Sequence, residues 1–284
     1  MKLTTKINCQ KEVIKITTFI KTTVYSAGFS KVIVPLSGGV DSATTAFLAV
    51  KALGIKNALI VRLPYQGLNT DRDAELVIKK LKIPETNVFE INIQPVVDLF
   101  WKHLNKLSLR AKRSNLGRDC FVSLDFARDP RNDDLRLGNL MARVRMIIIY
   151  DLAKANQAMV CGTENKSEHL LGYYTLHGDS ASDLEPIRYL YKTQVRELAK
   201  FLGVPEKIIA KPPTAGLWKG QTDEGELGFS YQEADQILSL FFDKKYPQEK
   251  IIKMGFKKNV VKKVFAQVEK NSFKEKLPYL IFTN

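Results

Sequence analysis

Cysteine is scarce in this sequence, and long hydrophobic runs are missing. The three cysteines, Cys9, Cys120 and Cys161, lie far apart and include no C-x-x-C pair, which excludes a disulfide framework and a cysteine zinc site. No stretch approaches the roughly 18–20 uninterrupted apolar residues of a membrane span, and the lysine-punctuated start lacks the apolar core of a signal peptide. We therefore expect a soluble, cytoplasmic protein with no membrane partner.

Negative charge is also in short supply. The 284 residues carry 44 Lys and Arg against 30 Asp and Glu, a formal net charge of +14, and 45% are hydrophobic, an ordinary share for a globular protein. The positive excess suits a polyanionic ligand such as a nucleotide or a nucleic acid. Half of it lies in residues 243–276, where 11 lysines alternate with apolar residues as on solvated helix faces, and no aromatic is spaced to stack bases. We therefore expect no nucleic-acid partner.

Short apolar runs alternate with amphipathic stretches in the first part of the chain. The pattern predicts strands over residues 31–36, 58–61, 88–93 and 157–161. It predicts helices over residues 12–27, 43–53, 71–81, 95–107 and 138–155. Such alternation is typical of βαβ units. We predict an α/β fold in which helices flank a parallel sheet and residues 230–284 form a helical C-terminal part of the same domain.

Residues 108–134 do not fit this pattern. They are rich in Arg, Asn and Asp, show little periodicity and separate two well-patterned helices. A structureless connection of this length is unusual inside a compact domain. We interpret the segment as an insertion within a single domain that spans residues 1–284.

A glycine-rich loop follows the first predicted strand and opens the next helix. It reads Ser37-Gly38-Gly39-Val40-Asp41-Ser42. Two glycines let backbone N–H groups approach a phosphate, and the helix N-terminus adds partial positive charge. The serine hydroxyls can donate to phosphate oxygens, and Asp41 can hold Mg²⁺. The chain has no Gly-Lys pair and no G-x-G-x-x-G run, which excludes a Walker A loop and a dinucleotide fingerprint. The S-G-G-x-D-S pattern resembles the pyrophosphate loop of ATP pyrophosphatases.

Such a loop serves reactions that need no protein nucleophile. Transfer of AMP to a carboxylate or amide oxygen makes an adenylate, which an amine or a sulfur nucleophile then displaces. The protein aligns the groups and neutralises phosphate charge. Consistent with this, the three histidines, His103, His169 and His177, form no catalytic constellation that the sequence reveals.

Five segments that follow one another along the chain from residue 138 onward indicate which family of ATP pyrophosphatases the sequence resembles. They read GNLMARVRM (138–146), GTENKSE (162–168), GYYT (172–175), KTQV (192–195) and TAGLW (214–218). Together with the loop, this series closely resembles ammonia-dependent NAD synthetase over nearly the whole chain, residues 108–134 excepted. The resemblance implies an adenine nucleotide alpha hydrolase-like (Rossmann-like) fold and a ligase, usually a homodimer, that uses Mg²⁺. That family converts deamido-NAD, ATP and ammonia to NAD through an adenylated intermediate and releases AMP and pyrophosphate.

The resemblance also implies a set of site residues. Asp41 and Glu168 correspond to magnesium ligands, and Lys192 corresponds to a residue that neutralises the ATP phosphates. We count Asp41 and Lys192 as catalytic together with Asp179, which lies close in sequence to the substrate-binding positions and which we expect to position or deprotonate ammonium. The implied ATP-binding residues are Pro35, Leu36, Ser37, Gly38, Gly39, Val40, Asp41, Ser42, Arg62, Thr163, Lys192 and Thr214. The implied deamido-NAD-binding residues are Asn139, Arg143, Tyr150, Tyr173, Asp183, Phe273 and Lys274.

Two positions depart from the family pattern. Leu176 stands where the family often has lysine, and Phe273 stands where it commonly has histidine before Lys274. A charged contact to deamido-NAD is therefore absent or supplied by another residue. Because the motifs extend from Pro35 to Lys274, we expect ammonia rather than glutamine as the nitrogen donor.

Two other functions remain open at this stage. A tRNA-modifying ATP pyrophosphatase would suit the positive charge, but its sulfur-transfer versions usually need a poised cysteine, which neither Cys120 nor Cys161 resembles. A basic nucleic-acid-binding module without enzymatic activity would leave the loop carboxylates without a role.

Overall fold

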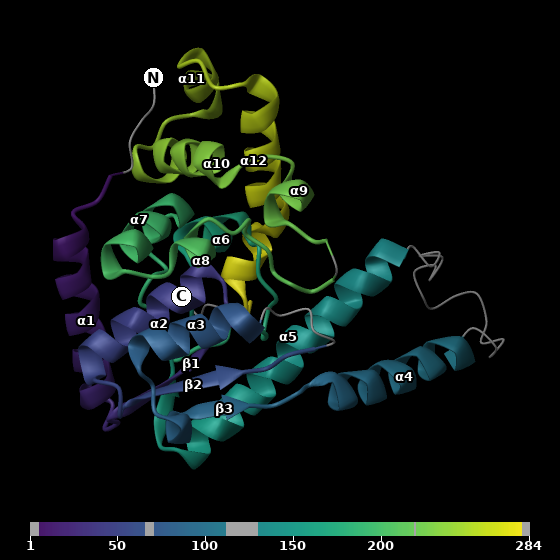
Figure 1. Ribbon diagram of the computed structural model, residues 1–284. Coiled ribbons are helices and arrows are strands. Elements are labelled where there is room, and N and C mark those ends of the chain that lie inside the picture. Colours follow the sequence, from purple (N-terminus) through teal and green to yellow (C-terminus); the bar gives the residue numbers. More distant parts are fainter. Residues whose placement is uncertain (1–5, 66–70, 112–129, 219, 280–284) are drawn as a thin grey trace, which may run out of the picture.

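The computed structural model describes residues 6–65, 71–111, 130–218 and 220–279. Its centre is a sheet in which neighbouring strands run parallel in the order β3-β2-β1-β4 (Figure 1). The strands are β1 (Lys31–Pro35), β2 (Ala58–Arg62), β3 (Val88–Glu90) and β4 (Ala158–Val160). β1 and β2 are nearly continuous buried apolar runs, as expected for central parallel strands that are covered on both faces.

Helices cover both faces of the sheet. Because side chains alternate along a strand, Val32 and Val34 of β1 pack on one side and Ile33 on the other. The first side carries α1 (Cys9–Ser26), α2 (Val40–Leu53), α3 (Asp71–Leu81) and α7 (Lys192–Leu202). The second side carries α4 (Gln94–Ala111) and α5 (Pro130–Ala155).

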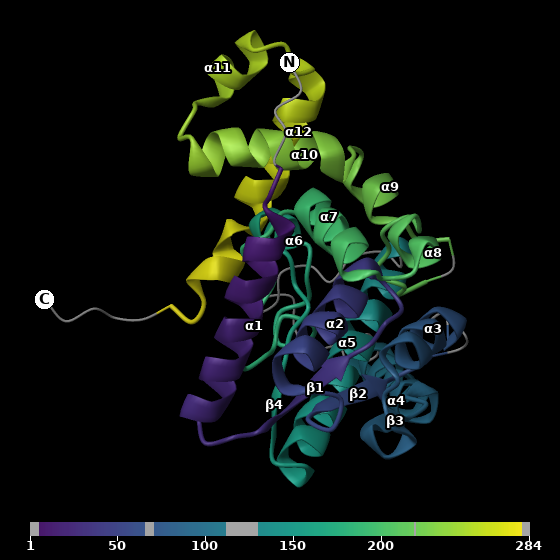
Figure 2. The same cartoon turned by 60° about the vertical axis from the view of Figure 1, so that its left-hand side comes forward.

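The last part of the chain is helical and has its own apolar cluster. Its longer helices, α10 (Tyr231–Leu238) and α12 (Lys258–Asn271), pack around Tyr231, Ile237 and Val261. In Figure 2 these helices lie beyond α6 and α7, at the end of the molecule away from β3. The shorter elements are η1 (Glu85–Asn87), α6 (Lys166–Leu171), α8 (Glu206–Ile209), α9 (Asp223–Leu227), η2 (Ser239–Asp243), α11 (Gln248–Lys253) and η3 (Ser272–Lys276).

The prediction of a parallel α/β fold with a helical C-terminal part is confirmed. β3 and β4 are shorter than expected: residues 91–93, 157 and 161 lie outside the strands, although the N–H groups of Ile91 and Ile93 still donate to the carbonyls of Arg62 and Pro64 at 3.0 Å. The two helices around residues 108–134 extend into that segment: α4 continues to residue 111 and α5 starts at residue 130. The remainder of the predicted insertion lies outside the described residues. Within the described ranges, no helix has the length and apolar character needed to cross a membrane.

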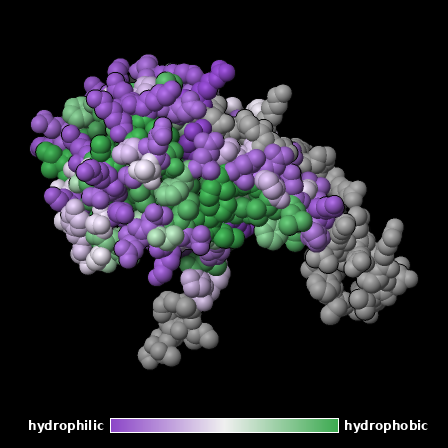
Figure 3. All heavy atoms as spheres, turned by 60° about the horizontal axis from the view of Figure 1, so that its bottom comes forward, coloured by the Kyte–Doolittle hydropathy of each residue, from purple (hydrophilic) through white to green (hydrophobic). Residues whose placement is uncertain are grey.

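α4 carries an apolar stripe that faces away from the core. Val96, Leu99, Phe100 and Leu104, at positions i, i+3, i+4 and i+8 of the helix, are 43–58% exposed. Figure 3 shows hydrophobic side chains gathered in a band on the side of the molecule where α4 and α5 lie. An exposed apolar stripe of this kind is typical of a protein–protein contact.

Candidate active site

A cavity of about 630 Å³ opens at the carboxyl ends of β1 and β4. The strand order reverses between these two neighbours, which is where ligands bind in open α/β sheets. Its wall comes from the loops that follow β1 and β4, from one face of α5, and from residues 172–181 and 211–218. The wall includes these predicted site residues: Pro35, Leu36, Ser37, Gly39, Val40, Asp41, Ser42, Asn139, Tyr150, Thr163, Glu168, Tyr173, Asp179, Lys192, Thr214 and Lys274.

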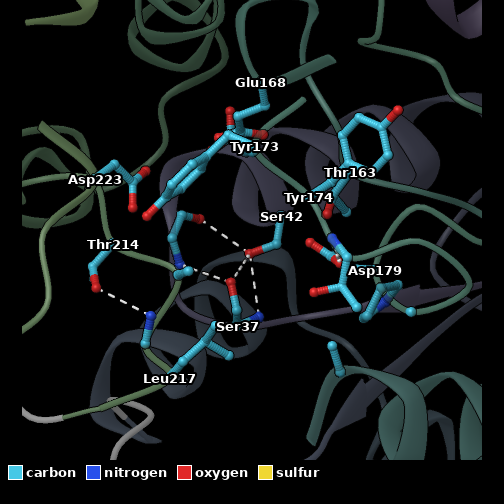
Figure 4. A pocket seen from close by; sticks show the side chains of 18 of the residues that line it. Ser37, Ser42, Thr163, Glu168, Tyr173, Tyr174, Asp179, Thr214, Leu217 and Asp223 are labelled. Atoms are coloured by element: carbon cyan, nitrogen blue, oxygen red, sulfur yellow. Dashed lines mark hydrogen bonds between the residues drawn. The ribbon is translucent and has the colours of Figure 1, made fainter. Parts of the chain in front are cut away.

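Hydrogen bonds of its own serines fix the conformation of the loop after β1. The Oγ atoms of Ser37 and Ser42 lie 3.1 Å apart, the Gly39 N–H donates to Ser37 Oγ at 3.3 Å, and Ser42 Oγ donates to the Gly39 carbonyl at 3.1 Å (Figure 4). Gly38 has φ +80°, a conformation that glycine adopts without steric cost. α2 starts at Val40 without a side-chain cap. The first residues of the helix, Val40, Asp41 and Ser42, line the cavity, and an uncapped helix start beside a cavity is suited to binding an anion.

Lys192 lies between the two predicted magnesium ligands. Its Nζ is 2.6 Å from Asp41 Oδ2 and 2.7 Å from Glu168 Oε1, and its side chain is only 4% exposed. Asn165 Nδ2 donates to the second Asp41 oxygen at 3.0 Å. Burial lowers the pKa of Lys192, but the two carboxylates raise it more, so the ammonium stays charged. Burial raises the pKa of Glu168, and the neighbouring Lys192 ammonium opposes this effect.

Residues far away in the sequence set the position of Lys192. Its backbone N–H donates to Ser167 Oγ at 2.8 Å, and that hydroxyl donates to Asp235 of α10 at 2.5 Å. Asp235 also accepts from the Thr193 N–H at 2.8 Å, and it is fully buried. The C-terminal helices therefore fasten the start of α7 against the site.

The donor set suits a hard divalent cation. Asp41 and Glu168 both reach one cation, the Lys192 ammonium, within 2.7 Å, and carboxylate oxygens are the ligands that Mg²⁺ prefers. Within the described ranges, no group of three or more His, Cys, Asp or Glu side chains is clustered closely enough to hold a metal ion. Two carboxylates with phosphate oxygens completing the shell is the usual arrangement for Mg²⁺ in nucleotide sites.

Thr163 is placed by an unusually close packing at the end of β4. The Gly162 N–H donates to the Leu184 carbonyl at 2.8 Å, and a Cβ on Gly162 would lie 1.9 Å from Glu185 Oε1. A side chain at position 162 would therefore displace the carboxylate end of Glu185. Burial raises the pKa of Glu185 to about 7.

The opposite wall contains Asp179 and the predicted deamido-NAD residues. The Thr175 N–H donates to Asp179 Oδ1 at 2.8 Å, and Thr175 Oγ1 donates to Asn139 Oδ1 at 2.8 Å. The side chain of Asp179 is open to the cavity, yet the protein around it raises its pKa by burial, which the Thr175 hydrogen bond partly offsets. Lys274 Nζ reaches the carbonyls of Gly172 at 2.5 Å and Tyr174 at 2.7 Å. η3 thus closes this wall.

Five predicted site residues are not part of the cavity wall. Gly38 contributes backbone conformation to the loop. Arg62 forms an ion pair with Glu90 at 2.8 Å. Phe273 is 44% exposed. The other two are Arg143 and Asp183, and for all five the binding roles stay predictions.

Arg143 and Asp183 have partners beside the cavity. Arg143 is exposed, and its Nε donates to the Leu176 carbonyl at 3.2 Å. Asp183 accepts from the Val160 N–H at 2.7 Å and from the hydroxyl of Tyr150 at 3.4 Å. Asp183 therefore orients Tyr150, which does line the cavity.

Five charged wall residues escaped the sequence analysis: Arg145, Lys211, Asp223, Glu226 and Lys270. Asp223 is 3% exposed and lies close enough to influence Lys192 electrostatically. Tyr173 donates a hydrogen bond to Glu226. A local concentration of acidic residues in a basic chain was the available signal for Asp223 and Glu226. Arg145 lies within the GNLMARVRM segment, but only its position on the helix α5 in the structure shows that it faces the cavity.

A parallel α/β sheet, an S-G-G-x-D-S loop at a helix start and a lysine between two carboxylates together define a nucleotide site of the ATP pyrophosphatase class. Comparison with known proteins identifies the family within this class. The family model NAD synthase matches residues 12–278. The chain belongs to the NAD synthase family, and its fold is adenine nucleotide alpha hydrolase-like.

Several named proteins are similar to the chain over nearly its full length. It is 42% identical to the NH(3)-dependent NAD(+) synthetase of Thermococcus kodakarensis, with 93% of each chain covered. It is 36% identical to the NH(3)-dependent NAD(+) synthetase of Fusobacterium nucleatum, with 92% of each covered. Among solved structures, an NMN synthetase from Francisella tularensis superposes with a TM-score of 0.74 at 29% identity and covers 98% of this chain and 99% of that one. The NH3-dependent NAD synthetase of Campylobacter jejuni gives a TM-score of 0.73 at 29% identity, with 97% and 100% covered.

Proposed function

We propose that this protein is an ATP-dependent ligase that converts deamido-NAD and ammonia to NAD and releases AMP and pyrophosphate. The observation that carries the proposal is the Lys192 ammonium, held within 2.7 Å of Asp41 and Glu168 beside the open start of α2. The names of the similar proteins and the length over which they match support the same reaction.

ATP binds along the loop formed by residues 35–42. The N–H groups at the start of α2 and the hydroxyls of Ser37 and Ser42 hold its phosphates, while Thr163 and Thr214 bind from the facing loops. Lys192 neutralises phosphate charge. Asp41 and Glu168 hold Mg²⁺, which supplies further charge neutralisation when it is bound.

The substrate carboxylate is activated before it reacts with ammonia. A carboxylate oxygen bonds to the α-phosphorus of ATP, and the bond from that phosphorus to pyrophosphate breaks. Asp179 positions the ammonium and accepts one proton from it, which gives ammonia; its location in the cavity and its raised pKa suit it to this role. Ammonia then bonds to the carboxyl carbon, the bond from this carbon to the oxygen of AMP breaks, and the nitrogen loses a second proton to solvent.

Deamido-NAD lies against α5, Tyr173 and Lys274. Asn139 and Tyr150 come from the cavity face of α5, with Tyr150 oriented by Asp183. Arg143, exposed and outside this cavity, reaches deamido-NAD from its position on the α5 surface. The enzyme is cytoplasmic and acts as a homodimer, with the exposed apolar stripe of α4 buried against a second copy.

The test is an assay of the purified protein with ATP, Mg²⁺, ammonium and deamido-NAD. We expect one NAD and one AMP for each deamido-NAD consumed. A parallel reaction with nicotinate mononucleotide compares the two substrates, since one structural neighbour is an NMN synthetase. Absence of AMP and NAD would refute the proposal. ATP cleavage that depends on added tRNA would favour the tRNA-modifying alternative instead.

The dimer is tested separately by sedimentation. The double variant Leu99→Glu/Phe100→Glu places two charges in the exposed stripe, where the wild-type side chains are 58% and 48% exposed. We expect the wild type to sediment as a dimer and the variant as a monomer of unchanged secondary structure. A variant that remains dimeric would exclude this face as the interface.

A further inference from the structure

Arg145 is a cavity residue whose guanidinium is only partly used by the protein. It projects from α5 into the cavity wall, and its Nε donates to the Leu63 carbonyl at 3.2 Å. Its Nη2 is buried and has no hydrogen-bond partner within the described part of the chain. Arg143, two residues earlier on the same helix, is exposed and outside the cavity. Because residues two positions apart point in different directions from a helix, Arg145 and not Arg143 faces this cavity.

A guanidinium in this state is costly unless a ligand completes its hydrogen bonds. Arginine carries five N–H donors and no acceptor, and a buried donor without a partner costs the full desolvation penalty of that group. Burial lowers the pKa of Arg145 to about 10, against the raising effect of Asp179, so the group remains charged at neutral pH. Because the guanidinium is charged, an anionic oxygen is the acceptor that would bind it most strongly.

The position of Asp179 indicates which anion this is. In the proposed reaction, ammonia bonds to the carboxyl carbon of the substrate, so the ammonium held by Asp179 must lie beside that carbon. Arg145 lines the same cavity and lies close enough to Asp179 for the two charges to interact. Its remaining donors are consequently next to the carboxyl oxygens rather than next to the pyrophosphate of the substrate.

We infer that Arg145 binds the nicotinate carboxylate of deamido-NAD and distinguishes this substrate from the amide product. The inference rests on the proposed function. The carboxylate accepts charge-assisted hydrogen bonds from the guanidinium, whereas the product amide carries no charge. Arg145 therefore holds substrate tightly and favours release of NAD once the amide has formed.

Binding of two ligands that differ at one group tests the inference. Deamido-NAD and NAD share the pyrophosphate and both ribosides but carry a carboxylate and an amide, respectively. Dissociation constants are measured by calorimetry without ATP for the wild type, Arg145→Gln, Arg145→Lys and the control Arg136→Gln. Arg136 lies on the same helix, is 46% exposed and pairs with Asp133 at 2.8 Å, away from the cavity.

We expect Arg145→Gln to weaken deamido-NAD binding about 10- to 100-fold, the range for a hydrogen bond to a charged group, and to change NAD binding less than about threefold. Arg145→Lys should recover part of the loss, and Arg136→Gln should match the wild type. Equal weakening of both ligands, or no weakening of either, would overturn the inference. If Arg145→Gln does not fold, binding of deamido-NAD and NAD is compared in Arg145→Lys, and equal weakening of both ligands in that variant overturns the inference. A wild type that makes no NAD refutes the proposed function, whereas an active wild type with unchanged ligand discrimination in the variants refutes only the role of Arg145.

Discussion

Replacing Lys192 with methionine removes the charge at the centre of the site while nearly keeping the volume of the side chain. The ammonium pairs with Asp41 at 2.6 Å and Glu168 at 2.7 Å, and the three side chains are only 4%, 14% and 17% exposed. Removing one partner of a buried ion pair costs about 3–5 kcal/mol, because the remaining charge stays buried without compensation. Here two carboxylates lose their shared cation.

The expected cost can be read as a shift in melting temperature. For a chain of this size, about 1 kcal/mol corresponds to roughly 2 °C, so Lys192→Met should melt about 6–10 °C below the wild type in EDTA. Mg²⁺ should raise the melting temperature of the variant more than that of the wild type, because the two carboxylates are then free to bind it. Turnover should fall by about 10²–10³, as for loss of one group that stabilises developing charge.

The matched control is Lys200→Met on the same helix, where the lysine is exposed. This control should melt within about 1 °C of the wild type, as is usual for surface substitutions. The measurement is differential scanning calorimetry with and without Mg²⁺, followed by an AMP-release assay. If the Lys192→Met variant has the same melting temperature as the control in EDTA, the idea that the ammonium stabilises the two carboxylates is refuted.

Three further substitutions probe separate parts of the site. Asp41→Asn should reduce turnover at least about 100-fold while the circular dichroism spectrum is unchanged; near-normal turnover would exclude Asp41 as a metal ligand. Glu185→Gln tests the pKa of Glu185, raised by burial from 4.5 to about 7. Stabilisation from the protonated carboxyl is complete below pH 4.5 and lost as the pH rises through about 7, so the wild type should lose up to about 3 kcal/mol over this range and the variant should not; parallel melting curves against pH would contradict this. Lys274→Met should raise the KM for deamido-NAD about 10-fold without changing that for ATP, and equal effects on both would contradict its place on the deamido-NAD wall.

The sequence alone determined the elements that depend on local pattern. The buried run of β1, the S-G-G-x-D-S loop and the helix that follows it could be predicted because apolar periodicity and glycine placement act over a few residues. The helix begins at Val40, three residues before the predicted start at residue 43. The family resemblance of the later segments implied that Asp41, Glu168 and Lys192 belong to one site. In the structure, contacts of 2.6 and 2.7 Å join the three side chains.

What only the tertiary structure decided is which side chains face the cavity and what holds them there. Arg143 and Arg145 are indistinguishable by composition, yet two positions on a helix differ by about 200° in direction, and only Arg145 lines the wall. Likewise, Asp235 reaches the start of α7 from a helix more than 40 residues away, a contact that no local pattern records. The sequence therefore determined the chemistry that is available, whereas the packing of helices on the sheet decided which charges meet in the cavity.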